Sequence, residues 1–219
     1  MNDTLLWIGV GTALVAGLWS GYTVFYEGNL DRPEYQVTLS DGVYELRSYD
    51  SFVIASTPMR SNDRSGMNGG FRSLAGYIFG GNKPQEKLAM TVPVMTTPKG
   101  EQLPMTAPVI TQTVDGTMAF VMPKGRTLSD LPQPNSERVS LRRVDWGVAA
   151  AIRYSGYATP ERVERHKKAL MEWIAKKGYE AKAEAISAQY NSPSAMPLLR
   201  RNEIIVRVRP VVTGAVAEE

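Results

Sequence analysis

Apolar and polar residues alternate in two stretches of the chain that are close copies of each other. Residues 86–94 read EKLAMTVPV and residues 101–109 read EQLPMTAPV. In the first copy Leu88, Met90 and Val92 fall on one side and the intervening residues on the other. This period of two predicts a half-buried strand for each copy.

The segment between the two copies has the composition of a tight turn. Thr97–Gly100 reads TPKG, with proline at the second position and glycine at the fourth, which suits a β-turn. Each copy also carries a proline, Pro93 or Pro108, which has no N–H to donate and belongs at a strand edge, bulge or end. The sequence therefore predicts a hairpin whose apolar face is rich in methionine.

Two other stretches carry apolar residues at helical spacing. A first helix is predicted near Arg64–Phe79, with Gly80 and Gly81 as its stop. A second is predicted near Pro160–Lys177, with Thr159 as the N-cap and a glycine just beyond its end. The apolar stripe of the first helix consists of Met67, Phe71, Leu74, Ala75 and Ile78.

A longer internal repeat indicates how these elements are organised. ELRSYDSFVIAS at residues 45–56 aligns without a gap with SLRRVDWGVAAA at residues 140–151, and one predicted helix follows each copy. Further strands are predicted near Met118–Met122, Glu184–Tyr190 and Glu203–Val208, with a proline-rich loop at 127–134. The fold class predicted is α+β, with two related halves that form a curved antiparallel sheet and one helix per half laid on it.

Composition narrows the function classes. The chain has 219 residues, a formal net charge of +3 and basic residues scattered among acids, so no nucleic-acid partner is expected. It has no cysteine, which excludes disulfides, thiolate metal sites and cysteine nucleophiles. With His166 as the one histidine, a multi-histidine metal site or a serine triad has almost nothing to build from.

The N-terminus differs from the rest of the chain. Thr4–Tyr26 contains no charged residue, and as a helix it would reach roughly 35 Å, enough to cross a hydrocarbon core of about 30 Å. We therefore expect residues 1–26 to be a transmembrane anchor or signal segment and 27–34 a linker, with the folded domain at 35–209 and a flexible tail at 210–219. The localisation predicted is membrane-anchored, with the domain on the periplasmic or extracytoplasmic side; a cleaved signal peptide and a soluble terminal helix are the alternatives.

Six motifs then occur in an order that resembles the SOUL family of haem-binding proteins. They are YELRSYDSFVIAS, FRSLAGYIFGGN, EKLAMTVPV, AFVMP, LPQPN and LLRRNEIIVRV, which together span about residues 33–209. The resemblance implies a twisted antiparallel β-barrel or sheet flanked by two helices and built from two pseudo-repeats, and the binding of haem or another porphyrin. Some family members are thought to ligate iron through a histidine near their early strands, and this chain has none there.

The residues themselves can be asked whether they suit haem. Haem requires an apolar slot, cationic groups for its two propionates and, optionally, an axial ligand. We expect the slot beside the first helix, with cationic groups on or just beyond it, Arg64 among them. The expected cofactor-binding residues are Met67, Phe71, Arg72, Leu74, Ala75, Ile78, Lys83, Lys87, Met90 and Met105.

His166 is the candidate metal ligand. It lies on the apolar stripe of the second helix, where it either packs as a structural residue or faces a cavity and ligates iron.

Two further functions remain open for the whole domain. It could be a pocket protein for another hydrophobic ligand, or a tetrapyrrole-modifying enzyme, although no pair of acidic residues has a spacing that argues for catalysis. The RRNE element at 200–203 is expected to form a structural ion-pair network.

Overall fold

The structure is a computed structural model of the whole chain. It describes residues 19–21, 32–61, 63–83, 88, 94–98, 116–191 and 195–211, and within 94–98 the side chain of Met95 only. The strands are β1 (Tyr35–Asp41), β2 (Tyr44–Tyr49), β3 (Phe52–Met59), β4 (Asn82–Lys83), β5 (Val94–Pro98), β6 (Gly116–Val121), β7 (Gln133–Pro134), β8 (Ser140–Val144), β9 (Gly147–Tyr154), β10 (Tyr179–Ala181), β11 (Ile186–Gln189) and β12 (Asn202–Pro210). The helices are α2 (Arg64–Ile78), α3 (Pro160–Lys176) and the short 3₁₀ helix η3 (Pro197–Leu199).

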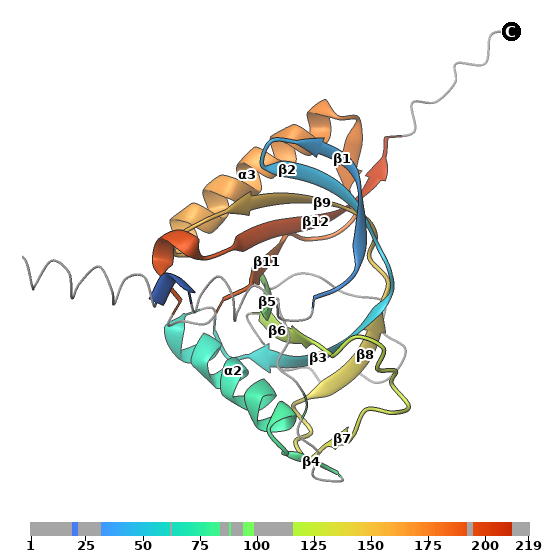
Figure 1. Cartoon of the computed structure of the whole chain (residues 1–219), viewed down its shortest axis with the longest axis vertical. Helices are drawn as coiled ribbons and strands as arrows, with labels where there is room; N and C mark the ends of the chain where they lie inside the picture. Colours follow the sequence, from blue (N-terminus) through green and yellow to red (C-terminus); the bar gives the residue numbers. More distant parts are fainter. Residues whose placement is uncertain are drawn as a thin grey trace, which may run out of the picture.

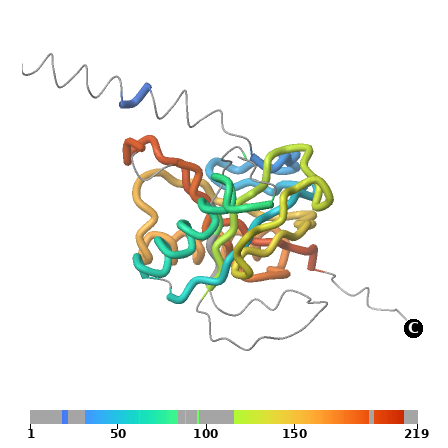
Figure 2. The backbone as a smooth tube through the Cα atoms, turned by 90° about the horizontal axis from the view of Figure 1, so that it is seen from below, coloured from blue at the N-terminus to red at the C-terminus, as the bar shows by residue number. Residues whose placement is uncertain are grey.

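One strongly curved antiparallel sheet contains ten of these strands. Its order is β1-β2-β9-β12-β11-β5-β6-β3-β8, with β10 paired to β12, while β4 and β7 form a separate ribbon. Within the described residues β1 and β8 do not pair with each other, so the sheet stays open (Figure 1). Figure 2 shows the early strands β1–β3 running alongside β8 and β9, which lie far away in the sequence.

The strand order confirms the two pseudo-repeats. The internal repeat at 45–56 and 140–151 makes β2 and β3 the counterparts of β8 and β9, and the strands that follow α2 are the counterparts of those that follow α3. When each strand on the path from β2 to β8 is replaced by its counterpart, the result is the same path read in the opposite direction. The central pair of this symmetric arrangement is β11 with β5. The predicted α+β class is therefore confirmed, with an open twisted sheet in place of a closed barrel.

Each helix begins where the sequence supplies a capping side chain. Asp63 accepts a hydrogen bond from the backbone N–H of Gly66 at the start of α2, and Thr159 accepts one from Arg162 at the start of α3. Gly178, at a φ of +77°, follows the end of α3, where a residue other than glycine would be strained. Both helices lie within a residue or two of the predicted bounds.

The sheet buries both of its faces. On one side, α3 covers the upper half of the sheet and α2 the lower half (Figure 1). Under α3 lie Ile204 and Val206 of β12, whereas Ile205 between them points to the opposite face. That inner face is lined by apolar residues from both halves, so the concave side of the sheet is a core as well.

Two predictions about the chain outside this core need correction. Thr97 and Pro98, expected in a turn, belong to β5, because β5 pairs with β6 as far as Pro98 opposite Gly116. Most of the twin motif at 86–94 and 101–109 lies outside the described residues. β12 continues to Pro210, the first residue of the expected tail.

The expected membrane segment also lies outside the described residues, except for the helical positions 19–21. In the part of the chain that the structure does describe, no helix is long and apolar enough to span a membrane. A span requires about 20 apolar residues, whereas α3 has 17 residues and α2 has 15, and each carries a polar face. The prediction of a membrane-anchored, extracytoplasmic protein is therefore wrong on this finding.

The glycines of α2 provide a test of how closely this helix packs against the loop before it. A Cβ on Gly66 would overlap the backbone carbonyl of Ser61, whereas a Cβ on Gly69 would meet nothing within 4 Å. We expect Gly66→Ala to lower the free energy of unfolding by about 1–3 kcal/mol through overpacking. Gly69→Ala should raise it by up to about 1 kcal/mol because alanine favours a helix. Urea unfolding followed by circular dichroism checks both, and equal effects of the two substitutions would contradict the close approach of α2 to the loop before it.

Candidate functional site

The outer edge of α2 carries a row of incompletely buried apolar residues. Met67, Phe71 and Ala75 follow one another at intervals of four, so they share one edge of the helix. Met67 and Ala75 are half-buried and Phe71 is 37% exposed. The Phe71 ring stands edge-on to Phe120 of β6, with 5.4 Å between the ring centres. We call Met67, Phe71 and Ala75 the α2 edge.

Two other expected ligand contacts on this helix are part of the core. Leu74 is 0% exposed, and Ile78 is also buried, both packed among residues of β3 and β6. Gly70 lets the helix approach the sheet, since a Cβ there would come within 3.2 Å of Met59. Leu74 and Ile78 therefore support the α2 edge from behind and offer no surface to a ligand.

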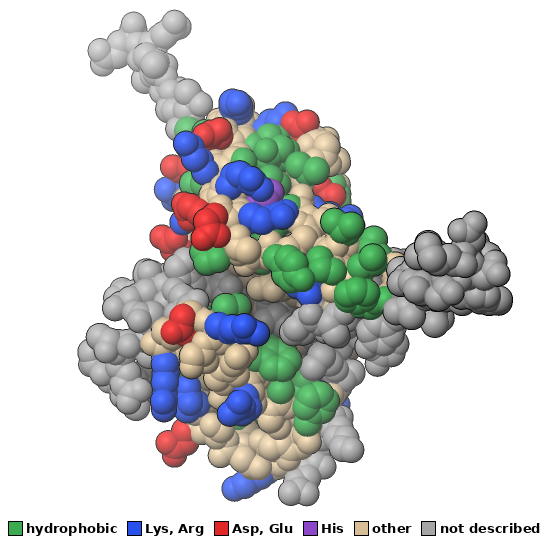
Figure 3. All heavy atoms as spheres, turned by 90° about the vertical axis from the view of Figure 1, so that its left-hand side faces the viewer, with side chains coloured by type: hydrophobic (Ala, Val, Ile, Leu, Met, Phe, Trp, Pro, Cys, Tyr) green, Lys and Arg blue, Asp and Glu red, His purple; other side chains and the backbone are tan. Residues whose placement is uncertain are grey.

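The expected cationic residues flank the α2 edge. Arg64 and Arg72 are exposed on α2, and Lys83 is exposed on β4 just after the helix. Figure 3 shows Lys and Arg side chains beside hydrophobic ones on the lower half of the molecule, the half that α2 covers. Three further expected residues, Lys87, Met90 and Met105, lie outside the described residues.

His166 lies in the other half of the molecule. It is a half-buried residue of α3, and its ring stacks on Tyr154 with 4.0 Å between the ring centres. Its Nδ1 is 2.6 Å from the backbone carbonyl oxygen of Arg162, so this nitrogen carries the proton and donates. The structure thus places Arg64 and Arg72 on the same helix as the α2 edge and Lys83 just beyond that helix, whereas His166 lies on α3.

A buried ion-pair network occupies the concave side of the sheet. Glu203 of β12 is 0% exposed, and Arg47 of β2 is 2% exposed. Arg47 donates from Nη1 to Glu203 Oε2 at 2.7 Å and from Nη2 to Oε1 at 3.0 Å, a bidentate pair. Arg201 adds bonds from Nε and Nη2 to Oε1 at 3.0 and 2.6 Å, and Tyr190 donates its hydroxyl to Oε2 at 2.7 Å.

These contacts fix the ionisation of the network. Burial disfavours the charged carboxylate of Glu203, but hydrogen bonds from Arg47 and the charges of Arg47 and Arg201 outweigh it and lower its pKa to about 2. Burial and the neighbouring Glu203 charge raise the pKa of Tyr190 well above its usual value, so its hydroxyl stays protonated and keeps donating. Arg47 also donates from Nε to Glu45 at 2.7 Å, so two carboxylates balance two guanidinium groups.

The sequence revealed only half of this network. The expected ion pair within the RRNE element is confirmed between Arg201 and Glu203. Arg200 takes a different role, since it donates to the carbonyl of Ala195 and lies over the ring of Tyr157. The pairing of Arg47 with Glu203 was not predicted, because the two residues lie 156 positions apart in the sequence. The available signal was a charged residue on the inward side of an alternating strand.

A cavity that the sequence analysis missed lies at the corner where β2 turns into β3. Its volume is about 620 Å³, within the range of pockets that take a drug-sized molecule. The start of β3, the end of β6 with the loop after it, β8 and the segment before β1 form its walls. None of the expected site residues lines it.

The family of the chain follows from a comparison with known protein families. The model of the SOUL heme-binding proteins matches residues 30–100 and 97–207, one match for each pseudo-repeat. The chain belongs to the SOUL family. No curated protein sequence matches it.

Solved structures add a likeness of fold. This SOUL family chain is similar to the C-terminal domain of EcmrR, with a TM-score of 0.56, 13% identity and coverage of 81% of this chain and 99% of that one. It is also similar to a hydrolase from Listeria innocua, with a TM-score of 0.53, 11% identity and coverage of 78% and 94%. At such identities the likeness shows the shared fold alone.

The donors around the α2 edge can be compared with what haem requires. An apolar edge with exposed arginines and a lysine nearby suits a flat apolar molecule with two carboxylates. For the iron, the one histidine of the chain, His166, lies on α3 and not at this edge. The α2 edge of this SOUL domain therefore offers apolar surface and nearby cations but no histidine ligand.

The buried network predicts a large difference between two glutamates. Glu203→Gln keeps the shape of the side chain but leaves Arg47 buried with less compensating charge, and should lower the free energy of unfolding by about 3–5 kcal/mol at pH 7. Glu180→Gln removes the exposed pair with Arg209 and should cost less than about 1 kcal/mol. Urea unfolding of both variants provides the measurement.

The stability difference between the wild-type protein and Glu203→Gln should also depend on pH. Because the pKa of Glu203 is lowered from 4.5 to about 2, its ionisation stabilises the fold above pH 4.5, and this contribution disappears as the pH falls to about 2. The stability gap between wild type and Glu203→Gln should therefore shrink from pH 5 to pH 2. A gap that stays constant over this range would show that Glu203 is not ionised in the folded protein.

Proposed function

We propose that this protein binds haem or a related tetrapyrrole non-covalently on the α2 edge. The observation that carries the proposal is Phe71, an aromatic ring left 37% exposed on a helix that buries Leu74, Tyr77 and Ile78. Membership of a family named for heme binding supports the choice of ligand. An apolar edge of this kind favours a flat apolar partner over a polar one, because contact between two apolar surfaces removes both of them from water.

Each part of the α2 edge has a role in this proposal. Phe71 packs against the porphyrin face while Phe120 supports it from β6, and Met67 adapts its flexible thioether to the rim of the ring. Arg72 and Lys83 attract the propionates, together with Lys87, which is proposed from the sequence alone. Bound haem would supply an iron centre. We assign no residue of the α2 edge as an iron ligand, so solvent or a side chain from elsewhere would fill that position.

A second candidate occupant is another bulky apolar molecule. It is favoured by the position of the one histidine, His166, on α3 and not at the α2 edge, since such a guest needs no histidine ligand. Both occupants use the same contacts with Phe71 and Met67. A titration with ferric haem and with metal-free protoporphyrin separates them, because a saturable Soret change supports the tetrapyrrole and no saturable change with either favours the other guest.

The central residue of the α2 edge provides a direct test. Phe71→Asp places a carboxylate against the porphyrin, where it cannot be hydrated, and should weaken haem binding by at least about tenfold. Phe79→Asp is the matched control, because Phe79 is also an exposed phenylalanine but lies beyond the end of α2. Haem titrations followed at the Soret band give the two dissociation constants.

A third variant guards against a loss of folding. Phe71→Leu retains an apolar side chain against Phe120 and should bind haem within about threefold of the parent. Circular dichroism confirms that all three variants are folded. If folded Phe71→Asp binds haem as tightly as Phe79→Asp does, the α2 edge is not the site.

His166 is proposed to be structural. His166→Ala removes the ring stacked on Tyr154 and should cost about 1 kcal/mol of stability. Because α3 and α2 cover different halves of the sheet, the affinity for haem and the ferric absorption spectrum should stay unchanged. Loss of a low-spin histidine signature in the folded variant would instead make His166 the axial ligand.

A further inference from the structure

The cavity at the β2–β3 corner has an apolar floor. Val53 of β3, Val121 of β6 and Met122 line it and are all buried. Phe52 forms one wall, and its ring is fixed edge-on to Trp146 with 4.9 Å between the ring centres. Leu128, on the loop after β6, is exposed beside the opening. A guest in the cavity covers the half-buried Phe52 ring and the exposed Leu128 side chain, and so removes apolar surface from water without rearranging the sheet.

The rim of the cavity is predominantly basic. Its ionisable lining residues are the cations Arg32, Lys124, Arg126 and Arg143 and the carboxylates Glu34 and Asp50. Lys124 pairs with Glu34 on the surface, where solvent screens both charges. Arg126 contacts Asp130, which lies outside the cavity.

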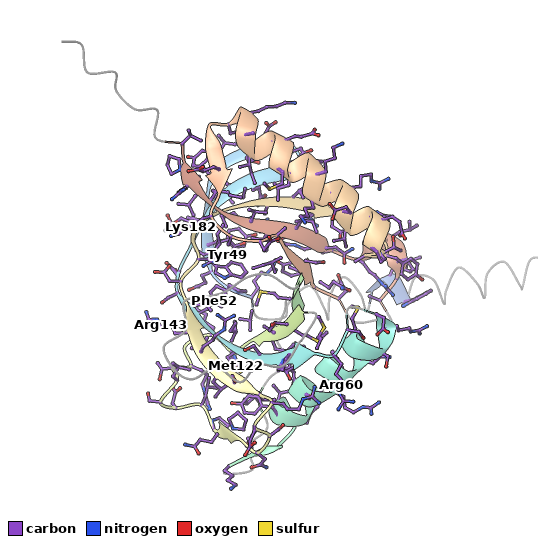
Figure 4. The ribbon with its side chains drawn as sticks, turned by 180° about the vertical axis from the view of Figure 1, so that it is seen from behind. Tyr49, Phe52, Arg60, Met122, Arg143 and Lys182 are labelled. Carbon is purple, nitrogen blue, oxygen red and sulfur yellow. The ribbon has the colours of Figure 1, made fainter. Side chains whose placement is uncertain are left out.

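Arg143 differs from the other cations of the rim. It lies on β8 opposite Val53 of the floor. Its Nε and Nη2 donate to the hydroxyl oxygen of Ser51 at 3.0 and 2.5 Å. A hydroxyl orients the guanidinium group without neutralising it, so these bonds leave its positive charge for an anion. Figure 4 labels Phe52, Met122 and Arg143, which come from neighbouring parts of the sheet on the left of that view.

We propose that this cavity is a second ligand site, which takes a small amphipathic anion, an apolar body with one carboxylate or sulfonate group. The apolar body lies between the Phe52 ring and Leu128, above the buried floor, and the anionic group lies at the rim against Arg143. The volume of about 620 Å³ suits a guest of drug size. The excess of cations over carboxylates on the rim selects an anion over a neutral or cationic analogue of the same shape.

The site is separate from the α2 edge. Its lining residues include none of Met67, Phe71 or Ala75. β6 contributes neighbouring residues to the two places: Val121 lines the cavity and Phe120 contacts Phe71, and the side chains of Val121 and Phe120 point to opposite faces of the sheet. The proposal therefore stands or falls independently of haem binding.

Pyrene probes provide the experiment, on the full chain. We expect 1-pyrenebutyrate to bind saturably with one site per chain, as followed by its fluorescence, and the neutral analogue 1-pyrenebutanol to bind about tenfold more weakly. Arg143→Gln should weaken pyrenebutyrate about tenfold and leave pyrenebutanol unchanged. Arg165→Gln, an exposed position on α3, is the matched control and should leave both probes unchanged.

A second variant tests the mouth of the cavity without disturbing the core. Leu128→Asp changes an exposed residue and adds a negative charge, and should weaken pyrenebutyrate at least fivefold. Phe71→Asp should leave it unchanged even where haem binding is lost. Absence of saturable binding, or binding that Arg143→Gln and Leu128→Asp leave unaltered, overturns the proposal. Loss of the probe in folded Phe71→Asp would place it on the α2 edge and overturn the proposal as well.

Discussion

The sheet depends on the ion pairs and hydrogen bonds of one buried carboxylate, that of Glu203. A sheet that curves until its concave face is a core has to fill that face, and here the filling includes one acid and two guanidinium groups. An isolated buried charge is costly, so the arrangement is stable only while Arg47, Arg201 and Tyr190 all reach the same two oxygens. Arg47 lies on β2, Arg201 directly precedes β12, and Tyr190 directly follows β11. β11 and β12 pair with each other but β2 pairs with neither, so the network holds β2 at a fixed distance from strands that it does not pair with.

This interior leaves ligand binding to the outside of the sheet. Apolar residues and the satisfied network occupy the concave face, and α3 covers the upper half of the opposite face. Under α2 the core is closed by Leu74 and Tyr77, whose hydroxyl donates to the carbonyl of Pro132 at 2.8 Å. The two surfaces that we propose for ligands are the α2 edge and the β2–β3 corner cavity. Both are supported from behind by a well-packed core, which keeps their shape ready for a ligand.

Much of the fold could be predicted from the sequence because its signals are local. Helix caps, apolar periods and the 45–56 and 140–151 repeat located α2, α3 and the two halves. The α2 stripe was harder, since periodicity places Phe71 and Leu74 on one apolar side without saying which is covered. The sheet decides this, as it buries Leu74 and leaves Phe71 at the rim. The Arg47–Glu203 pair and the corner cavity depend on segments distant in sequence, so no local pattern announces them.

The most direct test of the account is a map of the amides that ferric haem affects. Paramagnetic iron broadens nearby resonances, so a stoichiometric amount of haem should remove the backbone amide signals around Met67, Phe71 and Ala75 of α2. Signals of α3 around His166, and those around Phe52 and Arg143, should persist. Broadening centred on α3 or on the β2–β3 corner, with the α2 signals intact, would contradict the α2 edge as the haem site.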